Sequence, residues 1–119
     1  MTQNKTDRIT GYHAHVYFDP DTEPVAAKLR EALETGFDVT MGRWRHEPVG
    51  PHPQSMYQVA FAPEQFAAVV PFLALNRGPL NVLVHPLTDD AYADHIDFAM
   101  WLGDRLTLDT SVLKREEPA

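Results

Sequence analysis

The chain has 119 residues and a net charge of −7, from 17 Asp and Glu against 10 Lys and Arg, which fits a single domain over residues 1–119 and argues against nucleic acid as a partner. No apolar stretch approaches the roughly 20 residues that a bilayer crossing requires, and the first ten residues are polar, so we expect no membrane partner and a cytoplasmic location. Because cysteine is absent, any bound metal must accept nitrogen and oxygen ligands, which favours iron, manganese or zinc.

The first predicted strand, residues 11–18, alternates apolar side chains with two histidines, His13 and His15. Since side chains of a strand point to opposite faces in turn, one face is expected to be apolar and the other to hold the histidines. A turn and an apolar helical stripe then predict a helix up to Gly36, followed by a second strand over residues 37–41.

A proline-rich loop comes next, because residues 47–54 hold three prolines and a glycine. Such a loop has few backbone conformations and can hold His52 at a low entropic cost. Residues 56–61 predict a third strand, which a second helix follows. Residues 80–84 predict a fourth strand that presents His85 at its end.

A last helix is expected over residues 90–102, where His95 shares an apolar stripe with its neighbours one and two turns away. The polar residues 1–9 and the charged tail at residues 114–119 are expected to fray, which leaves a core of about residues 11–113.

This order of elements is the split βαβ pattern, so we expect an α+β fold: a ferredoxin-like βαββαβ antiparallel sheet with an additional C-terminal helix. We expect strands one and three to lie parallel in the middle, with strand four antiparallel beside strand one. His13, His52 and His85 would then meet at one edge of the sheet, with His15 one step away. Because the helices must cover the apolar face, the histidine face is expected to be open and to form a homodimer.

This convergence favours a metal or catalytic site, since neutral imidazole offers a lone pair to a cation and costs little to desolvate. Each histidine also has a plainer interpretation. His13 and His15 could lie on the wet face of the sheet, His52 could be structural, and His85 could simply end a strand.

Further polar residues are candidates for supporting roles. His95 could be a core residue or an acid/base group, and Asp94 beside it could orient a ligand or relay a proton. Glu47 is the candidate oxygen ligand, with a solvated charge as the alternative. Three arginines could meet a substrate carboxylate: Arg43, Arg45 and Arg77. Of these, Arg43 and Arg77 are the expected substrate contacts, although a solvated surface position is the default for an arginine.

Four spaced segments give the chain a resemblance to a known family: YHAHVYF, EPVGPHP with MYQVAF after it, LALNRGPLNVLVHP, and DH-x5-WLG at residues 94–103. With these segments the chain resembles the DOPA 4,5-dioxygenase family over residues 11–113. The resemblance implies a ferredoxin-like α+β fold. One departure is Asp89, which stands where the family often has a glycine and affects the shape of that loop.

The resemblance implies extradiol cleavage of a catechol, DOPA-like or related, by O2 at a nonhaem Fe(II), with zinc or another divalent metal as a substitute. On this interpretation the metal ligands are His15, His52 and His85, and the proton-transfer residues are His13 and His95. Two alternatives stay open. A noncatalytic dimeric module could bind a metal or small ligand, and a zinc-dependent hydrolase could use the same ligands to activate water.

Overall fold

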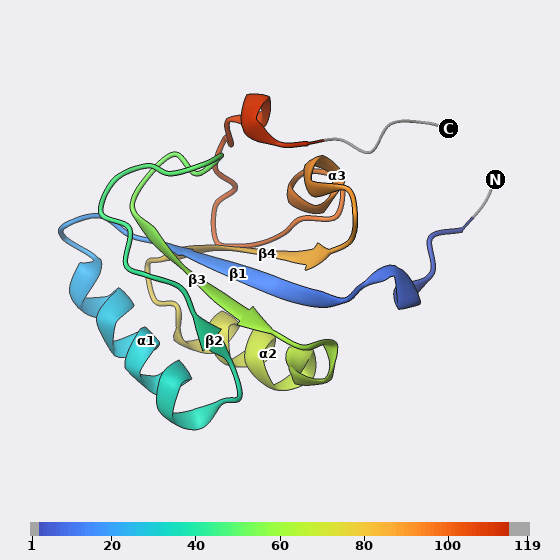
Figure 1. Ribbon diagram of the computed structural model, residues 1–119. Helices are drawn as coiled ribbons and strands as arrows, with labels where there is room; N and C mark the ends of the chain where they lie inside the picture. The colour runs from blue at the N-terminus through green and yellow to red at the C-terminus, as the bar shows by residue number, and fades with distance from the viewer. Residues whose placement is uncertain (1–2, 115–119) are drawn as a thin grey trace.

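An antiparallel sheet of five strands, in the order β2-β3-β1-β4-β5, forms the centre of the computed structural model, which describes residues 3–114 (Figure 1). The strands are β1 (Gly11–Tyr17), β2 (Thr40–Met41), β3 (Met56–Phe61), β4 (Asn81–Leu87) and β5 (Met100–Leu102). Helices α1 (Glu23–Gly36) and α2 (Phe66–Asn76) cover one face of the sheet, and α3 (Ala91–His95) lies over the other (Figure 1). The predicted fold class is confirmed, and β5 adds a strand to it.

The central strand β1 runs antiparallel to both of its neighbours, so the expected parallel pairing of strands one and three is wrong. A right-handed crossover through α1 makes β2 parallel to β1, and β3 fills the gap between them in the antiparallel direction. Tyr17 at the end of β1 therefore pairs with Met56 at the start of β3. The loop that holds His52 approaches from this end, whereas His13 pairs with His85 nearer the other end. The histidines cannot meet at one edge as predicted, and they meet over the face of the sheet instead.

The helical face holds the main apolar core. Ala14 and Val16 of β1 point into it, together with side chains from α1, α2, β3 and β4. The fully buried members include Leu33, Val59, Val69, Leu73, Val82 and Val84. Burying a side chain of this size contributes roughly 1.5–3 kcal/mol relative to leaving it exposed, so this face supplies much of the stability of the fold.

The opposite face is covered by the chain itself, which corrects the expectation of an open face. The side chains of His15 and His85 are 3% and 0% exposed. A second, smaller apolar cluster lies on this side, formed by Tyr17, Met56, Leu83 and Leu108 with Trp101 packed against it. The predicted homodimer stays a prediction, which the mass of the protein in solution tests.

The last helix is shorter than predicted, because it ends at His95 and residues 100–102 form β5. The Asp90 carboxylate caps the start of α3 by accepting a hydrogen bond from the Ala93 backbone N–H at 2.9 Å. The apolar spacing misled the prediction, since the step of four positions from Phe98 to Leu102 is close to one helical turn and also equals two strand periods. Leu102 lies in β5, where it packs against the main core and pairs with Val82 on β4.

Smaller differences concern the strands and the chain ends. The second strand is shorter than predicted, and β4 extends to Leu87, so that His85 lies within the strand. The residues Thr6–Arg8 form a short 3-10 helix where a frayed end was expected, whereas the tail at residues 115–119 lies outside the described residues. None of the helices within residues 3–114 has the length and apolar character that a membrane crossing requires.

Candidate metal centre

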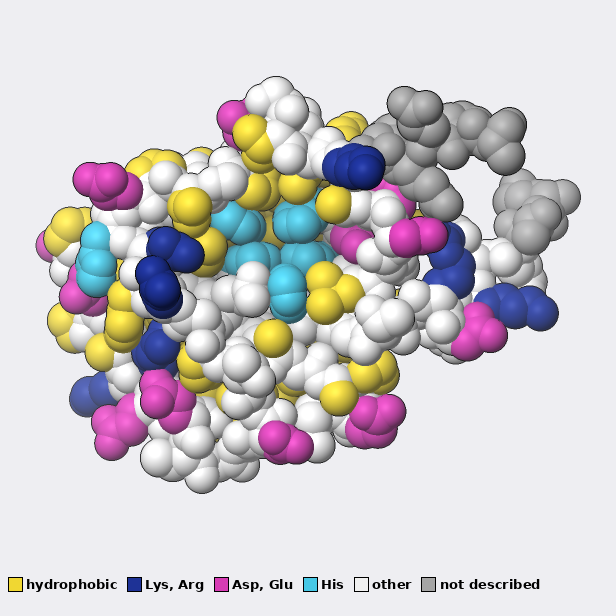
Figure 2. All heavy atoms as spheres, viewed as in Figure 1, with side chains coloured by type: hydrophobic (Ala, Val, Ile, Leu, Met, Phe, Trp, Pro, Cys, Tyr) yellow, Lys and Arg dark blue, Asp and Glu magenta, His cyan; other side chains and the backbone are white. Residues whose placement is uncertain are grey.

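Five histidine side chains gather over the middle of the sheet, at the bottom of a hollow (cyan in Figure 2). They come from four segments: β1, β4, the loop before β3 and the end of α3. The ring centroids of His85 and His95 lie 4.0 Å apart, and those of His15 and His52 lie 4.1 Å apart. The convergence of histidines that the sequence predicts is thus present, and it includes His95.

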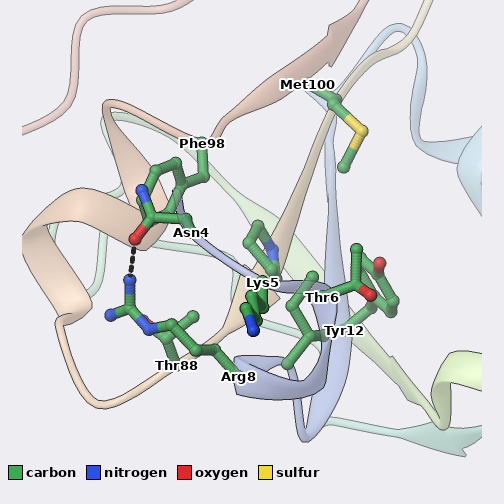
Figure 3. A pocket seen from close by; sticks show the side chains of 10 residues that line it. Asn4, Lys5, Thr6, Arg8, Tyr12, Thr88, Phe98 and Met100 are labelled. Carbon is green, nitrogen blue, oxygen red and sulfur yellow. Dashed lines mark hydrogen bonds between the residues drawn. The ribbon is translucent and has the colours of Figure 1, made fainter. Parts of the chain in front are cut away.

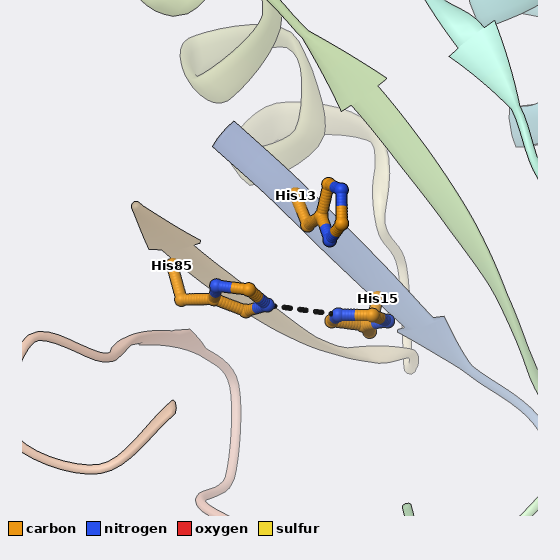
Figure 4. A group of neighbouring side chains, drawn as sticks. All are labelled: His13, His15 and His85. Atoms are coloured by element: carbon orange, nitrogen blue, oxygen red, sulfur yellow. Dashed lines mark hydrogen bonds between the residues drawn. The ribbon is translucent and has the colours of Figure 1, made fainter. Parts of the chain in front are cut away.

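The strand register explains how three of these rings meet. His13 and His15 lie two residues apart on β1 and therefore share a face, and the β1–β4 register places His85 directly opposite His13 (Figure 4). The ring of His13 lies 5.7 Å from that of His15 and 5.4 Å from that of His85.

Backbone carbonyls fix the tautomers of two rings. The Nδ1 atom of His85 lies 2.9 Å from the Pro86 carbonyl oxygen, and the Nδ1 atom of His95 lies 2.7 Å from the Ala91 carbonyl oxygen. A carbonyl oxygen only accepts, so Nδ1–H must donate in both cases. The Nε2 atom of each ring then keeps its lone pair, which is the arrangement that metal-binding histidines use.

His15 gives the clearest indication that the cluster could hold a cation. Its Nε2 atom lies 3.0 Å from Nε2 of His85, and its Nδ1 atom is buried without a hydrogen-bond partner among the described residues. A buried polar atom without a partner costs about 1–3 kcal/mol. A metal ion would accept these nitrogen lone pairs as ligands and so remove the free-energy cost of burying them unpaired. The donor set therefore fits a metal.

Four of the five clustered histidines have a pKa below the usual value: His13, His15, His52 and His85. Burial, with the neighbouring His52, His85, His13 and His95 as lesser causes, holds the pKa of His15 well below its usual value. Burial likewise lowers the pKa of His52 to about 4 and the pKa of His85 to about 3, and it lowers the pKa of His13. Neutral rings leave their lone pairs available to a cation.

Two overlapping sets of ligand atoms could hold an ion. Each set has its nitrogen atoms within 4.8 Å of one another: His13, His15 and His85 form one, and His15, His52 and His95 form the other. His15 belongs to both. The ligands expected from the sequence, His15, His52 and His85, are therefore divided between the two sets. Glu47 is exposed and belongs to neither set.

A cavity of about 260 Å³ opens onto His15 and His52 and is also lined by Arg43 and Arg45. Cationic side chains stand beside the hollow in Figure 2. Arg77 is not brought to this cavity, because its guanidinium donates to the Leu80 carbonyl oxygen at 3.1 Å in the turn before β4.

Two further cavities differ in their relation to the histidines. One of about 310 Å³ borders His95 and is lined by Trp101 and Arg105. Another of about 330 Å³ lies beneath the N-terminal segment, between Tyr12 and Met100, and none of the five clustered histidines lines it (Figure 3). The candidate site is therefore assigned to the histidine cluster and its adjoining cavities.

The sequence interpretation assigned no role to Tyr17, whose hydroxyl lies 2.7 Å from Nδ1 of His52. The strand alternation was a usable signal, since Tyr17 stands two residues after His15 and so shares the histidine face. Asp94 anchors a turn, and its considered roles in orienting a ligand or relaying a proton stay predictions. Its buried carboxylate accepts hydrogen bonds from the Thr88 backbone N–H at 2.9 Å and from the Thr88 hydroxyl at 2.5 Å, which fixes the turn after β4.

Comparisons with known proteins identify the family. The family model described as "Dopa 4,5-dioxygenase family" matches residues 12–112. An "Uncharacterized 21.2 kDa protein" of Botryotinia fuckeliana is 40% identical over 116 residues, which cover 87% of this chain and 63% of that protein. The DOPA 4,5-dioxygenase of Amanita muscaria is 34% identical over 114 residues, which cover 88% of this chain and 50% of that protein. The chain thus spans between half and two thirds of the length of these relatives.

A solved structure agrees over nearly its full length. The crystal structure of a putative dioxygenase from Nostoc punctiforme matches with a TM-score of 0.91 and 52% identity, covering 92% of this chain and 96% of that one. With the family match extending over nearly all of the described residues, the chain belongs to the Dopa 4,5-dioxygenase family.

Proposed function

We propose that the protein is an extradiol dioxygenase that opens the ring of a catechol with nonhaem Fe(II) and O2. The observation that carries this proposal is the cluster of five histidine side chains, three of them buried, beside a cavity with two arginines. Family membership and the name of the Amanita relative support the same chemistry. In the proposed reaction the carbon–carbon bond next to the diol breaks, and each new chain end receives one oxygen atom of O2.

His15, His52 and His85 are the proposed metal ligands. Because they are divided between the two sets, the rings of His52 and His85 would have to move closer together to share one ion. His15 is the member shared by both possible ligand sets, and His52 and His85 each have Nδ1 engaged in a hydrogen bond, which directs Nε2 to the ion. When bound, Fe(II) supplies a redox-active Lewis acid that accepts the catechol oxygens and passes ring electrons to O2.

His13 and His95 are the proposed proton carriers. Both are only partly buried, unlike the three proposed ligands. His13 has a lowered pKa and is therefore neutral before the substrate arrives, so that it can accept a catechol proton. His95 keeps a free lone pair on Nε2 and borders a cavity of its own, through which it can exchange the proton with solvent.

Arg43 and Arg45 are the proposed contacts of an anionic substrate group. Both are exposed and line the cavity that reaches His15 and His52, so they can bind a carboxylate while the ring reaches the metal centre. In this proposal Arg45 takes the place expected for Arg77, whose guanidinium is held by the turn before β4.

Anaerobic loading with Fe(II), followed by a panel of catechols in air, tests the activity. We expect O2 consumption and a yellow ring-opened product. Metal binding without O2 consumption for any catechol would instead indicate a binding module. Hydrolysis by the zinc form without O2 would indicate a hydrolase.

Variants of the cluster test the assignment of residues. We expect His52→Ala and His85→Ala to lower turnover by at least about 100-fold, since each would lose a ligand. His46→Ala is the matched control, because His46 is an exposed histidine that stacks on Trp44 outside the cluster. Equal turnover in all three variants would overturn the assignment.

A further inference from the structure

We propose that Tyr17 is a positioning residue: its hydroxyl engages Nδ1 of His52 and so directs Nε2 of that ring into the metal centre. This inference rests on the proposed function, because it concerns how one ligand of that site is held.

The contact is short and comes from a rigid element. The Tyr17 hydroxyl and Nδ1 of His52 lie 2.7 Å apart, and both side chains are buried. Tyr17 is the last residue of β1 and faces the same side of the sheet as His13 and His15. Strand β1 therefore fixes the position of the Tyr17 hydroxyl. The hydroxyl in turn orients the ring of His52, which lies in a loop.

His52 needs such a partner more than the other proposed ligands. His15 and His85 are carried by paired strands, whereas His52 follows a turn in which its backbone N–H bonds to the Val49 carbonyl at 3.0 Å. Within residues 3–114, the Tyr17 hydroxyl is the hydrogen-bond partner of the His52 ring. With Nδ1 occupied in either direction of the hydrogen bond, Nε2 is the nitrogen left to face the cluster.

Tyr17 is itself held on its other side. Its ring stacks on Trp101 with centroids 5.9 Å apart and planes at 18°, and it packs in the apolar cluster with Leu83 and Leu108. These contacts fix the direction of the phenol ring, and they therefore fix the direction in which its hydroxyl points.

Tyr17→Phe removes the hydroxyl and keeps the stacked ring. We expect this variant to bind Zn(II) and Co(II) about 10- to 100-fold more weakly than the wild type, which is the usual cost of losing a hydrogen bond to a ligating histidine. The visible spectrum of the Co(II) form should also change, because the ring is free to reorient.

Tyr57→Phe is the matched control. Tyr57 is also a buried tyrosine with one hydroxyl contact, a 2.8 Å hydrogen bond to the Ala26 carbonyl oxygen, but it lies on the helical face. We expect its metal affinity and Co(II) spectrum to match those of the wild type. Wild-type affinity and spectrum in Tyr17→Phe would overturn the proposal.

Nitrogen NMR of the Zn(II)-loaded wild-type protein gives a second test that does not depend on how a variant folds. The expected result is that zinc binds Nε2 of His52 and that Nδ1 stays engaged with Tyr17. Zinc on Nδ1, or no zinc on His52, would refute the inference. Failure of the dioxygenase proposal would give a different result. Tyr17→Phe would still bind metal more weakly than the wild type, but the wild type would consume no O2 with any catechol.

Discussion

The two faces of β1 bury side chains of opposite kinds. Ala14 and Val16 enter an apolar core, whereas His15 on the other side is also buried and has a ring nitrogen without a hydrogen-bond partner within residues 3–114. Burying polar groups in this way lowers stability unless something binds them. The helical face thus supplies stability, and the histidine face lowers it by an amount that a bound ion would offset.

Acid should have the largest effect, and it should act on the histidine face. Because the folded protein keeps the pKa of His52 at about 4 and that of His85 at about 3, the unfolded chain binds more protons below its own histidine pKa of about 6.5. Stability of the metal-free protein is full above that pH and falls below it. The expected loss is about 1.4 kcal/mol per pH unit for each of these two histidines, ending near their folded pKa values.

Urea unfolding of the metal-free protein at pH 6.5 and 4.5 measures this loss. We expect His52→Gln to show a shallower dependence on pH than the wild type, whereas His46→Gln, at an exposed position, should keep the wild-type dependence. An unchanged dependence in His52→Gln would mean that the buried histidines do not control acid stability.

A core substitution should affect the helical face alone. Leu33→Ala on α1 removes a fully buried side chain and should lower the free energy of unfolding by about 2–5 kcal/mol. Leu75→Ala on α2 is the control, since Leu75 is 86% exposed, and it should change stability by less than about 0.5 kcal/mol. Zinc titration of the folded Leu33→Ala protein should give the wild-type affinity. A weakened affinity would show that the two faces are coupled.

Metal should restore stability on the histidine face. Zn(II) at 100 times its dissociation constant should raise the free energy of unfolding by about 2.7 kcal/mol, and a chelator should reverse the gain. His15→Ala should abolish the gain, because His15 belongs to both possible ligand sets. Thermal unfolding with and without Zn(II) makes the measurement, and an equal gain in His15→Ala would place the ion elsewhere.

The smallest expected effect concerns the mouth of the cavity. Arg43→Gln should raise KM about 10-fold for a catechol that carries a carboxylate and leave KM unchanged for catechol itself. Arg105→Gln is the control, since Arg105 lines the cavity beside His95. If Arg105→Gln raises KM and Arg43→Gln does not, the substrate enters by that second cavity.

The sequence predicted the elements that local periodicity controls. The alternation in β1, the helix that ends at Gly36 and the strand at residues 56–61 all appear as expected, because each has one clear period. The prediction for the segment after His95 was wrong because its apolar spacing has no single clear period and suits a helix and a strand equally. Backbone pairing of β5 with β4 favours the strand over the helix. This pairing depends on a distant part of the chain, so the sequence of the segment alone does not reveal it.

The site was predictable in its residue types and less so in its arrangement. Clustered histidines indicated a shared centre, but the route by which His52 reaches it follows from the antiparallel pairing of β1 with β3. The Tyr17 contact and the carbonyl partners of His85 and His95 depend on tertiary geometry that no spacing reveals. Strand alternation places Tyr17 on the histidine face, but it gives no sign that the hydroxyl contacts His52.

The segments that cover the histidine face come late in the chain, which affects the order of folding during synthesis. Strands β1, β3 and β4 and both large helices lie within residues 11–87, whereas α3, Trp101 and Leu108 come later in the chain. Since a chain leaves the ribosome from its N-terminus, the segments that form the apolar layer emerge before the segments that close over the imidazoles. We therefore expect newly made protein to pass through a stage in which the ion site is still open to any competing metal in the cell.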